Sequence, residues 1–464
     1  MKARVKQDYT LAHLLQDPHF PYANACAAKQ CLENPWWKPF LAEHSFGLPL
    51  NIHSAKPAHA MHEDTKAVHL GRHPDRFAGT VNTPVFRAST ILSETVAEWE
   101  QKKKDRAQEK PGTYYGLHGT PNRHLLEEAL AELEGGYKCQ IYPSGLAACV
   151  IPILAYVKTG DHILVTDSVY GPTRRFCDVQ LKRLGVETTY YDPLIGAGIA
   201  ALMRPNTRVV FVESPGSLTF EVQDIPAIAE AAHRHQASGG GDGEGNTNKV
   251  IVMMDNTWGT PLYFKPFEHG VDVSIQATTK YIVGHSDVIM GSVTCTKEAW
   301  PALKAVTNDF GQTAAPDDCY LATRGLRTMA LRLRQHHESG IQLAEWIASQ
   351  PEVERVLHPA LPSDPGHALW KRDFKGACGL FGVVLKAGIK PEALHALIDG
   401  LDLYGLGASW GGYESLILHF DPREVRTATK WVHAGPCFRV HAGLEHIVDL
   451  IADMARGFQS LRTA

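Results

Sequence analysis

The sequence predicts an α/β fold in which a mostly parallel sheet forms a large domain and a smaller α+β domain follows it. Short apolar runs at residues 162–165, 209–212 and 250–254 indicate strands, and helical patterns at 172–184 and 222–235 separate them. Strands that alternate with helices form βαβ units, whose parallel sheet is covered on both faces. The length of 464 residues exceeds one ordinary core, so two domains and an extension are expected.

The composition is that of an ordinary soluble globular protein, with 44% hydrophobic and 21% charged residues. The formal net charge of -4 gives no electrostatic reason to expect binding to nucleic acid or to an anionic membrane. No apolar run approaches the roughly 20 residues of a spanning helix, and Asp8, His13 and Asp17 interrupt any secretory signal. Nine cysteines without a C-x-x-C pair argue against structural zinc and a disulfide scaffold. We therefore expect a cytoplasmic protein without a metal site.

Four segments are expected along the chain. Residues 1–60 are rich in proline and show no clear period, which predicts an irregular N-terminal extension. Residues 61–119 form an arm whose Lys- and Glu-rich stretch at 94–110 predicts a solvated helix. A first folded domain covers 120–326, and a second covers 327–464.

Local signals in the first domain begin with a helical pattern at 123–133 that ends at Gly135-Gly136, a typical helix stop. Residues 141–148 then pass from a strand through a turn of small residues into a helix. Such a turn leaves backbone N–H groups free to bind an anion. A glycine-rich stretch within 237–249 predicts a surface insertion.

The C-terminal domain follows a long helical pattern at 325–346. That pattern contains or adjoins Arg324, Arg327, Arg332 and Arg334, a density typical of a solvated or subunit-facing helix. Strands are expected near 380–385 and 416–419, and helices near 392–398 and 445–458. This mixture is typical of an α+β domain.

Polar residues follow several of the predicted parallel strands. Tyr170, Ser214 and Asp255 each come where an apolar strand ends. Ligands of such sheets bind at the carboxyl ends of the strands. Taken alone, Asp255 is more readily explained by capping of the next turn, and Tyr170 by half-buried packing.

Lys280 follows another short strand pattern, in which Val271, Val273 and Ile275 alternate with polar residues. A lysine placed after an apolar run can lose charge by desolvation and become an amine nucleophile. For an arbitrary lysine, a surface position at a strand end is the commoner explanation.

The residues around Lys280 favour the first explanation. The pattern Ser-x-x-x-x-Thr-Lys-Tyr-x-x-Gly-His-Ser-Asp at 274–287 resembles the cofactor-lysine segment of the pyridoxal-phosphate (PLP) enzymes of cysteine and methionine metabolism. The resemblance extends from about residue 64 to the C-terminus. It implies a fold-type-I PLP transferase-like fold with 120–326 as the PLP-binding domain, and it implies that the amine of Lys280 binds PLP.

The resemblance also implies the other contacts of the cofactor. Asp255 is expected to keep the pyridine nitrogen protonated, so that the ring can act as an electron sink. Tyr170 is expected to stack on the ring. The remaining cofactor-binding residues that the resemblance implies are Ser144, Gly145, Leu146, Thr279 and, from a neighbouring subunit, Tyr115.

Three substrate-binding residues are implied as well. Arg439 is expected to bind the substrate α-carboxylate, because an arginine on an apolar strand must be paired or must bind an anion; a structural ion pair is the alternative. Ser409 and Trp410 match the substrate-side loop, where Trp410 would shape the distal pocket. Two residues depart from the family pattern, since Leu117 stands where an arginine for the phosphate is expected and Asn308 replaces a tyrosine.

The activity that the resemblance implies is α,β-elimination of L-cystathionine to homocysteine, pyruvate and ammonia, in methionine biosynthesis. Lys280 would remove the Cα proton, with Tyr115 and Tyr170 assisting proton movement. Because the Tyr115 arm serves a neighbouring site in the family, a homodimer is the minimum unit and a homotetramer is expected. The alternatives are cleavage at Cγ, as in a cystathionine γ-lyase or γ-synthase, a cysteine desulfhydrase activity, or a non-catalytic binding or regulatory protein on the same fold.

Overall fold

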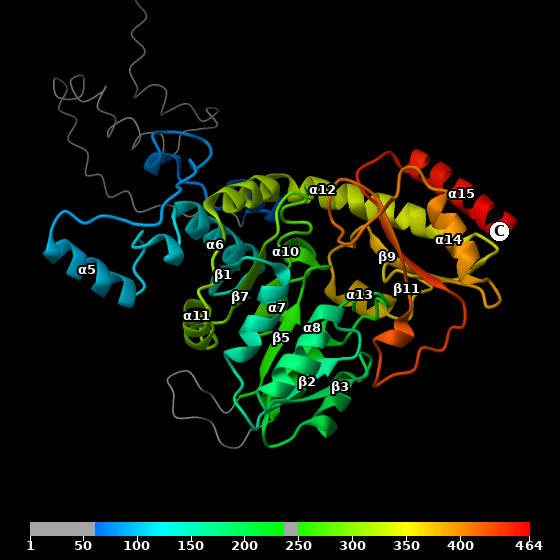
Figure 1. Ribbon diagram of the computed structural model, residues 1–464, viewed down its shortest axis with the longest axis horizontal. Helices are drawn as coiled ribbons and strands as arrows, with labels where there is room; N and C mark the ends of the chain where they lie inside the picture. The colour runs from blue at the N-terminus through cyan, green and yellow to red at the C-terminus, as the bar shows by residue number, and fades with distance from the viewer. Residues whose placement is uncertain (1–60, 236–248) are drawn as a thin grey trace, which may run out of the picture. The chain divides into compact units, whose positions relative to one another are not determined.

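The computed structural model describes residues 61–235 and 249–464, which fold around two sheets (Figure 1). Glu63–Ala464 form one compact unit. The predicted N-terminal extension, 1–60, lies outside the described residues, and so does all but the last residue of the predicted insertion at 237–249.

The larger sheet has seven strands in the order β1-β7-β6-β5-β4-β2-β3. All of its strands are parallel except β7, which pairs antiparallel with β1 and β6. The predicted, mostly parallel sheet is therefore confirmed. Its strands are β1 Lys138–Tyr142, β2 His162–Thr166, β3 Glu187–Tyr191, β4 Thr207–Glu213, β5 Ile251–Asp255, β6 Val273–Gln276 and β7 Gly291–Cys295.

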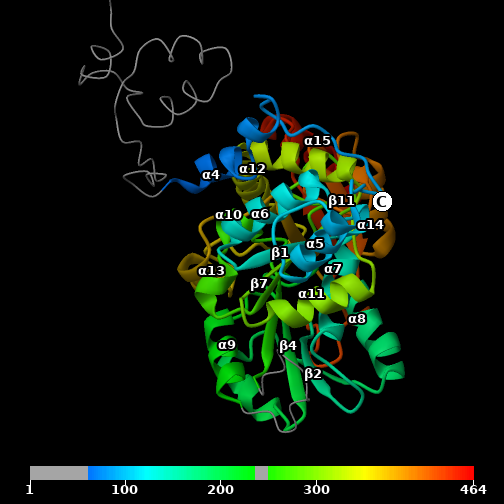
Figure 2. The ribbon, with the colours of Figure 1, turned by 90° about the vertical axis from the view of Figure 1, so that its left-hand side faces the viewer.

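Alternate side chains of this sheet enter two different hydrophobic cores. In β4, Val210 and Val212 belong to one core, whereas Val209 and Phe211 belong to the other. Successive strand residues point to opposite faces, so both faces of the sheet are covered. Figure 2 shows α9 on one side of the strands and α8 and α11 on the other. The helices are α6 Pro121–Glu134, α7 Gly145–Leu154, α8 Gly171–Phe176, α9 Ile225–Arg234, α10 Thr260–Tyr263 and α11 Trp300–Asp309.

Two of these helices show how local signals set their ends. α6 stops at Gly135, whose left-handed φ of 79° is the conformation that glycine adopts most readily at a helix end. The helix predicted over 172–184 is composite, because α8 ends at Phe176 and a π-helical turn, Cys177–Leu181, continues it.

The smaller sheet has five strands in the order β10-β11-β12-β9-β8. Only β10 and β11 pair in parallel, and two helices, α14 and α15, pack on a separate core of this sheet. The α+β character expected here is present. Its elements are β8 Val353–Leu357, α13 His367–Asp373, β9 Leu380–Leu385, α14 Pro391–Asp399, β10 Gly405–Leu406, β11 Leu416–Phe420, β12 Cys437–His441 and α15 Ile447–Thr463.

Helix α12, Pro316–Ala348, is continuous over 33 residues and joins the two sheets. Leu326 and Leu333 pack into a core of the larger sheet, and Leu343 packs into the core of the smaller one. The division expected between residues 326 and 327 therefore falls inside one helix rather than at a linker.

The arginines of α12 are not all solvated, contrary to the expectation from their density. Arg332 is buried and donates to the carbonyls of Tyr281 (2.7 Å) and Gly325 (2.8 Å). Arg327 donates to the carbonyls of Ala67 (2.9 Å) and Leu70 (2.7 Å). Long apolar stems and several donors allow arginine to bind main-chain carbonyls inside a protein.

The arm before α6 contains α4 Glu63–His69, the 3-10 turn η1 Pro74–Arg76, α5 Val96–Ala107 and the 3-10 turn η2 Gly116–His118. α4 packs on α12 and α6. α5 contains no buried residue, and Figure 1 shows it away from both sheets. The solvated helix predicted at 94–110 is therefore present within two or three residues of its expected ends.

Candidate active site

The predicted site residues gather at the carboxyl edge of the larger sheet. Ser144 follows β1, Tyr170 follows β2, Asp255 ends β5 and Lys280 follows β6. These strands are mutually parallel, so their carboxyl ends meet at one edge. The loop before β11, which contains Ser409, reaches the same place from the smaller sheet.

Lys280 lies in a tight turn after β6. Its backbone N–H donates to Ala277 O (2.9 Å), and its carbonyl accepts from Gly284 N (2.8 Å). The side-chain Nζ donates to Ser409 Oγ at 2.5 Å and lies 5.4 Å from the centre of the Trp410 ring. Burial, together with the positive charge of Arg439, lowers the pKa of Lys280 to about 8. The turn thus holds an amine that releases its proton more readily than an ordinary lysine.

Asp255 is buried at the end of β5 and is surrounded by donors. Its Oδ1 accepts from the backbone N of Thr257 (3.0 Å) and from Thr257 Oγ1 (2.5 Å). Its Oδ2 accepts from the thiol of Cys149 at 3.5 Å. Burial raises the pKa of Asp255, whereas these hydrogen bonds and the charge of Lys280 oppose the rise.

The turn after β1 leads directly into the N-terminus of α7. Ser144 Oγ caps the helix by accepting from Ala147 N at 3.1 Å. The first amides of a helix have no intrahelical partner, so those of Gly145 and Leu146 face the ligand side of the turn. A Cβ at Gly145 would lie 2.7 Å from the Cβ of Ala277, which is why only glycine fits beside the strand-end turn of Lys280.

The hydroxyl of Thr279 is already hydrogen-bonded to the main chain. Its Oγ1 donates to Met290 O (3.1 Å) and accepts from Met290 N (2.9 Å). These two bonds tie the Lys280 turn to the segment before β7. One lone pair of the hydroxyl remains, so Thr279 can offer a ligand only an acceptor unless the bond to Met290 breaks.

Arg439 projects from β12 toward the same region. Its Nη2 donates to the carbonyl of Ser409 at 3.1 Å, and burial lowers its pKa to about 10. Within residues 61–235 and 249–464, no carboxylate pairs with this guanidinium. The structural ion pair considered above is thus not found there. Ser409 itself has a φ of 86°, an uncommon backbone conformation that turns its carbonyl to Arg439 while its hydroxyl meets Lys280.

The two tyrosines lie in different settings. Tyr170 immediately precedes α8, is 42% exposed, and has a pKa raised by burial and by nearby acidic groups. Tyr115 lies on the arm at the start of η2 and is 45% exposed. Its described ring contact is with His118 of the same arm, and no described hydrogen bond joins it to Lys280. The single chain therefore assembles all the predicted side chains except Tyr115.

Three further residues contact this set and were missed in the sequence. Glu213 ends β4 and accepts from the backbone N of Tyr170 at 2.7 Å. Cys149 donates to Asp255, and His441 Nε2 lies 3.1 Å from Gly411 N in the loop of Ser409. Glu213 had a signal, because it follows a buried strand just as Asp255 does. The other two had no signal beyond their place in apolar runs.

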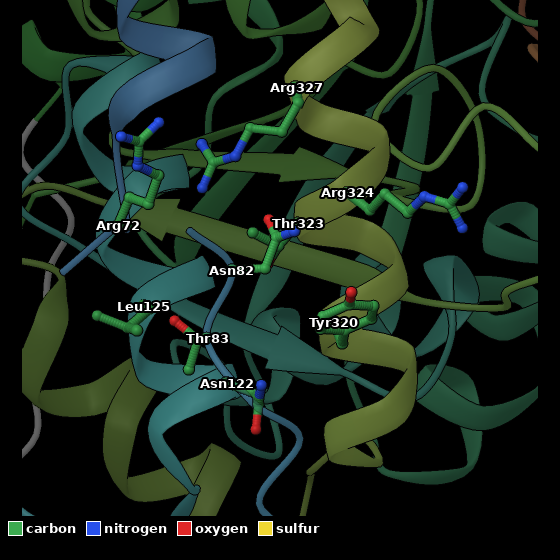
Figure 3. A pocket seen from close by; sticks show the side chains of 10 residues that line it. Arg72, Asn82, Thr83, Asn122, Leu125, Tyr320, Thr323, Arg324 and Arg327 are labelled. Atoms are coloured by element: carbon green, nitrogen blue, oxygen red, sulfur yellow. The ribbon is translucent and has the colours of Figure 1, made fainter. Parts of the chain in front are cut away.

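Two cavities lie apart from these residues. One, of about 560 Å³, is lined by His118 and Asn308 among others, so one of the two departures from the family pattern borders the arm. The other is lined by Arg72, Arg324 and Arg327 together with Asn and Thr side chains. Figure 3 shows the guanidinium groups of Arg72 and Arg327 near one another and that of Arg324 turned away. Neither lining includes Lys280, Asp255 or Arg439.

The described residues contain neither a membrane-spanning helix nor a cluster of metal ligands. In the part of the chain that the structure covers, no helix combines the length and apolarity needed to cross a membrane. No group of three or more His, Cys, Asp or Glu side chains among the same residues is arranged to hold a metal ion.

Comparisons with known proteins agree on one family. Residues 64–459 match the family described as Cys/Met metabolism PLP-dependent enzyme. The chain is 43% identical over 398 residues to the cystathionine β-lyase MetC of Escherichia coli K12, covering 85% of this chain and 98% of that protein. It is 44% identical to the cystathionine β-lyase of Salmonella typhimurium, with the same coverage. The crystal structure of metB from Corynebacterium glutamicum matches with a TM-score of 0.75 at 30% identity, over 87% of this chain and 99% of the other.

Proposed function

The chain belongs to the family of Cys/Met metabolism PLP-dependent enzymes, and from that premise we propose that it converts L-cystathionine to homocysteine, pyruvate and ammonia by α,β-elimination, in methionine biosynthesis. It is a carbon–sulfur lyase, similar over most of its length to relatives named cystathionine β-lyase. The observation that carries the proposal is the partly buried amine of Lys280, whose pKa is lowered to about 8 and which lies beside Ser409, Asp255 and Arg439.

The donor set at the sheet edge fits PLP. An amine with a lowered pKa suits an aldehyde, and a buried carboxylate at a strand end suits a protonated ring nitrogen. The N-terminus of α7 suits a phosphate, and a side chain at Gly145 would fill the space beside it. We therefore assign Lys280, Asp255, Tyr170, Ser144, Gly145, Leu146 and Thr279 to the cofactor. When bound, PLP supplies an electron sink for the charge that develops at Cα.

Lys280 is the base that we assign to the Cα proton. Its pKa of about 8 lies close to neutral pH, where a general base combines a free lone pair with sufficient basicity. Ser409 Oγ, 2.5 Å from Nζ, limits the directions in which the amine can point. Tyr170 remains a neutral phenol, since its pKa is raised, so it can donate a proton to the departing sulfur.

Arg439 binds the substrate α-carboxylate in this proposal. No carboxylate among the described residues pairs with the Arg439 guanidinium, so its other N–H groups can bind an anion. The apolar surroundings that lower the pKa of Arg439 also strengthen its attraction for that anion. The bond from Nη2 to the Ser409 carbonyl holds the guanidinium in place before substrate arrives. Trp410 lies over Lys280 and forms the wall of the site on the side of the substrate's distal part.

We also propose that the working unit is a homodimer or a homotetramer of such dimers. Tyr115 is exposed and follows α5, the helix that lies away from both sheets, and both features are explained if this part of the arm reaches a neighbouring site. Seven described cysteines are free, buried thiols, which suits a cytoplasmic protein.

A product assay on the purified full-length chain tests this function. With PLP and L-cystathionine, pyruvate and homocysteine should form in equal amounts. Lys280→Ala should lose the visible absorption of the bound cofactor and at least about 10³-fold in kcat/KM, whereas Lys297→Ala, on the exposed surface, should lose neither. Formation of 2-oxobutyrate and cysteine instead would assign cleavage at Cγ, and absence of bound cofactor would assign a non-catalytic role.

A further inference from the structure

Two carboxyl groups, one of them that of Asp255, lie side by side at the strand ends of the candidate active site. Glu213 ends β4 and Asp255 ends β5, and the two residues are direct partners in the parallel pairing of these strands. Register partners on adjacent strands point to the same face of a sheet. Glu213 is 9% exposed and Asp255 is 8% exposed. Among the described residues, neither carboxyl forms a salt bridge with a lysine or arginine.

Such a pair cannot carry two negative charges at little cost. Removing one charge from water is already expensive, and a second like charge on the neighbouring strand adds repulsion in a low-dielectric site. The two carboxyl groups therefore titrate as a unit that holds one proton over a wide range of pH. The hydrogen-bond donors around the two carboxyl groups decide which of them keeps this proton.

Those donors favour ionisation of Asp255. It accepts two hydrogen bonds from Thr257 and one from the thiol of Cys149, and Lys280 adds a favourable charge. Glu213 accepts from the backbone amide of Tyr170, and the backbone of Ser217 also favours its ionised form, but no described side chain donates to it as Thr257 and Cys149 do to Asp255. Burial and the neighbouring Asp255 raise the pKa of Glu213 well above that of an ordinary glutamate.

The other titratable groups around the pair do not change this assignment. Burial raises the pKa of Cys149 on α7 and of Tyr170 before α8, so both stay neutral near pH 7. Arg439 on β12 and Lys280 after β6 are the cationic groups that face the site, and Lys280 acts on Asp255 rather than on Glu213.

We propose that Glu213 is a positioning residue that stays protonated beside an ionised Asp255, so that the pair presents one negative charge to the cofactor while Glu213 holds the backbone of Tyr170. Its carboxyl oxygen fixes the start of the turn from which the Tyr170 ring projects. Because Glu213 keeps its proton, no second negative charge lies beside Asp255 to repel it. The inference rests on the proposed function, because Asp255 and Tyr170 are both assigned there to the cofactor.

Three variants of the full-length chain test the assignment. Glu213→Gln keeps an oxygen for Tyr170 N and is neutral, as the native side chain is proposed to be. Glu213→Leu removes that oxygen. Asp255→Asn removes the charge that Glu213 is proposed to protect. PLP affinity of the apoprotein, measured by fluorescence titration, should change less than about 3-fold for Glu213→Gln and weaken at least about 10-fold for the other two.

Infrared spectroscopy of the apoprotein gives a readout that needs neither cofactor nor activity. The difference between the native protein and Glu213→Gln at pH 7 should contain the C=O stretch of a protonated carboxylic acid. A carboxylate signal in its place, or a loss of PLP affinity in Glu213→Gln as large as in Asp255→Asn, would overturn the proposal. If native protein binds no PLP at all, the proposed function fails, and the infrared result still decides the protonation of Glu213.

Discussion

The amine of Lys280 is held where its positive charge is disfavoured. Burial and the charge of Arg439 lower its pKa from the ordinary 10.5 to about 8. In the unfolded chain the amine is solvated and keeps its ordinary pKa. Between about pH 8 and 10.5 the folded protein thus binds fewer protons than the unfolded one, so stability rises with pH in that range. Below pH 8 the destabilising effect of this lysine on the apoprotein is fully present.

Replacing Lys280 by methionine should therefore stabilise the apoprotein near neutral pH. Methionine keeps an unbranched apolar chain in the same space but carries no charge to desolvate. We expect a gain on the order of 2 kcal/mol in the free energy of unfolding at pH 7, and a smaller gain at pH 10. Urea unfolding of both proteins at both pH values measures it. Lys158→Met, at an exposed lysine, serves as control and should show no such dependence on pH; a Lys280→Met variant less stable than native protein at pH 7 would contradict the account.

For single residues, the sequence indicates which side chains are candidates for the site, but not which residues they contact. Lys280, Asp255 and Arg439 each stand out because a polar residue ends or interrupts an apolar strand. Glu213 carries the same signal, yet its importance comes from its register with Asp255, and pairing between β4 and β5 involves residues about forty positions apart. The left-handed φ of Ser409 could not be foreseen either, because serine has no preference for it.

Among the elements, the sequence predicts the continuous apolar strands and the alternating strand β6, but not β3 or β7. β2, β4 and β5 are continuous buried runs, which short windows of sequence identify. β3 lies at the sheet edge and contains two threonines with polar surroundings, and β7 begins with Gly291-Ser292. Whether such segments form strands depends on pairing partners from distant parts of the chain, so local composition does not indicate strands there.

Arg332 of helix α12 stabilises the Lys280 turn by hydrogen bonds to its main chain. Its guanidinium donates to the carbonyls of Tyr281 (2.7 Å) and Ile282 (3.3 Å), which directly follow Lys280. A Cβ at Gly284 would lie 1.9 Å from Arg332 Nη1, so glycine is needed for this approach. The helix thus satisfies main-chain groups that the turn leaves unpaired.

Arg332→Met should destabilise the protein by about 2–4 kcal/mol and weaken cofactor binding, because buried carbonyls next to Lys280 lose their donors. Urea unfolding of the apoprotein and PLP titration measure the two effects. Arg334→Met is the matched control on the same helix. Arg334 pairs with Asp64 at the surface, and removal of an exposed pair should change stability by less than about 1 kcal/mol. Equal effects of the two substitutions would refute a special role for Arg332.

For the whole molecule, the arm is the part that the proposed dimer would pack and complete. α5 has no buried residue. Its apolar side chains are exposed as well, with Val96 78% exposed and Trp99 49% exposed, and Leu92, which precedes the helix, is 83% exposed. A helix of 12 residues is marginal without packing on one face. A second copy of the chain that covers this face would bury these side chains and bring Tyr115 to the neighbouring site.

Mixed dimers distinguish a tyrosine that acts across subunits from one that acts within its own chain. Lys280→Ala and Tyr115→Ala homodimers should both be inactive on cystathionine. When the two chains carry different affinity tags and are purified together, one site of each dimer receives an intact Lys280 from one chain and an intact Tyr115 from the other. Activity should then recover to about half that of the native dimer. Tyr137, which has the same exposed fraction of 45%, supplies the control, because Tyr137→Ala homodimers should be active by themselves. If mixing restores nothing, Tyr115 serves its own chain and the arm does not complete a partner's site.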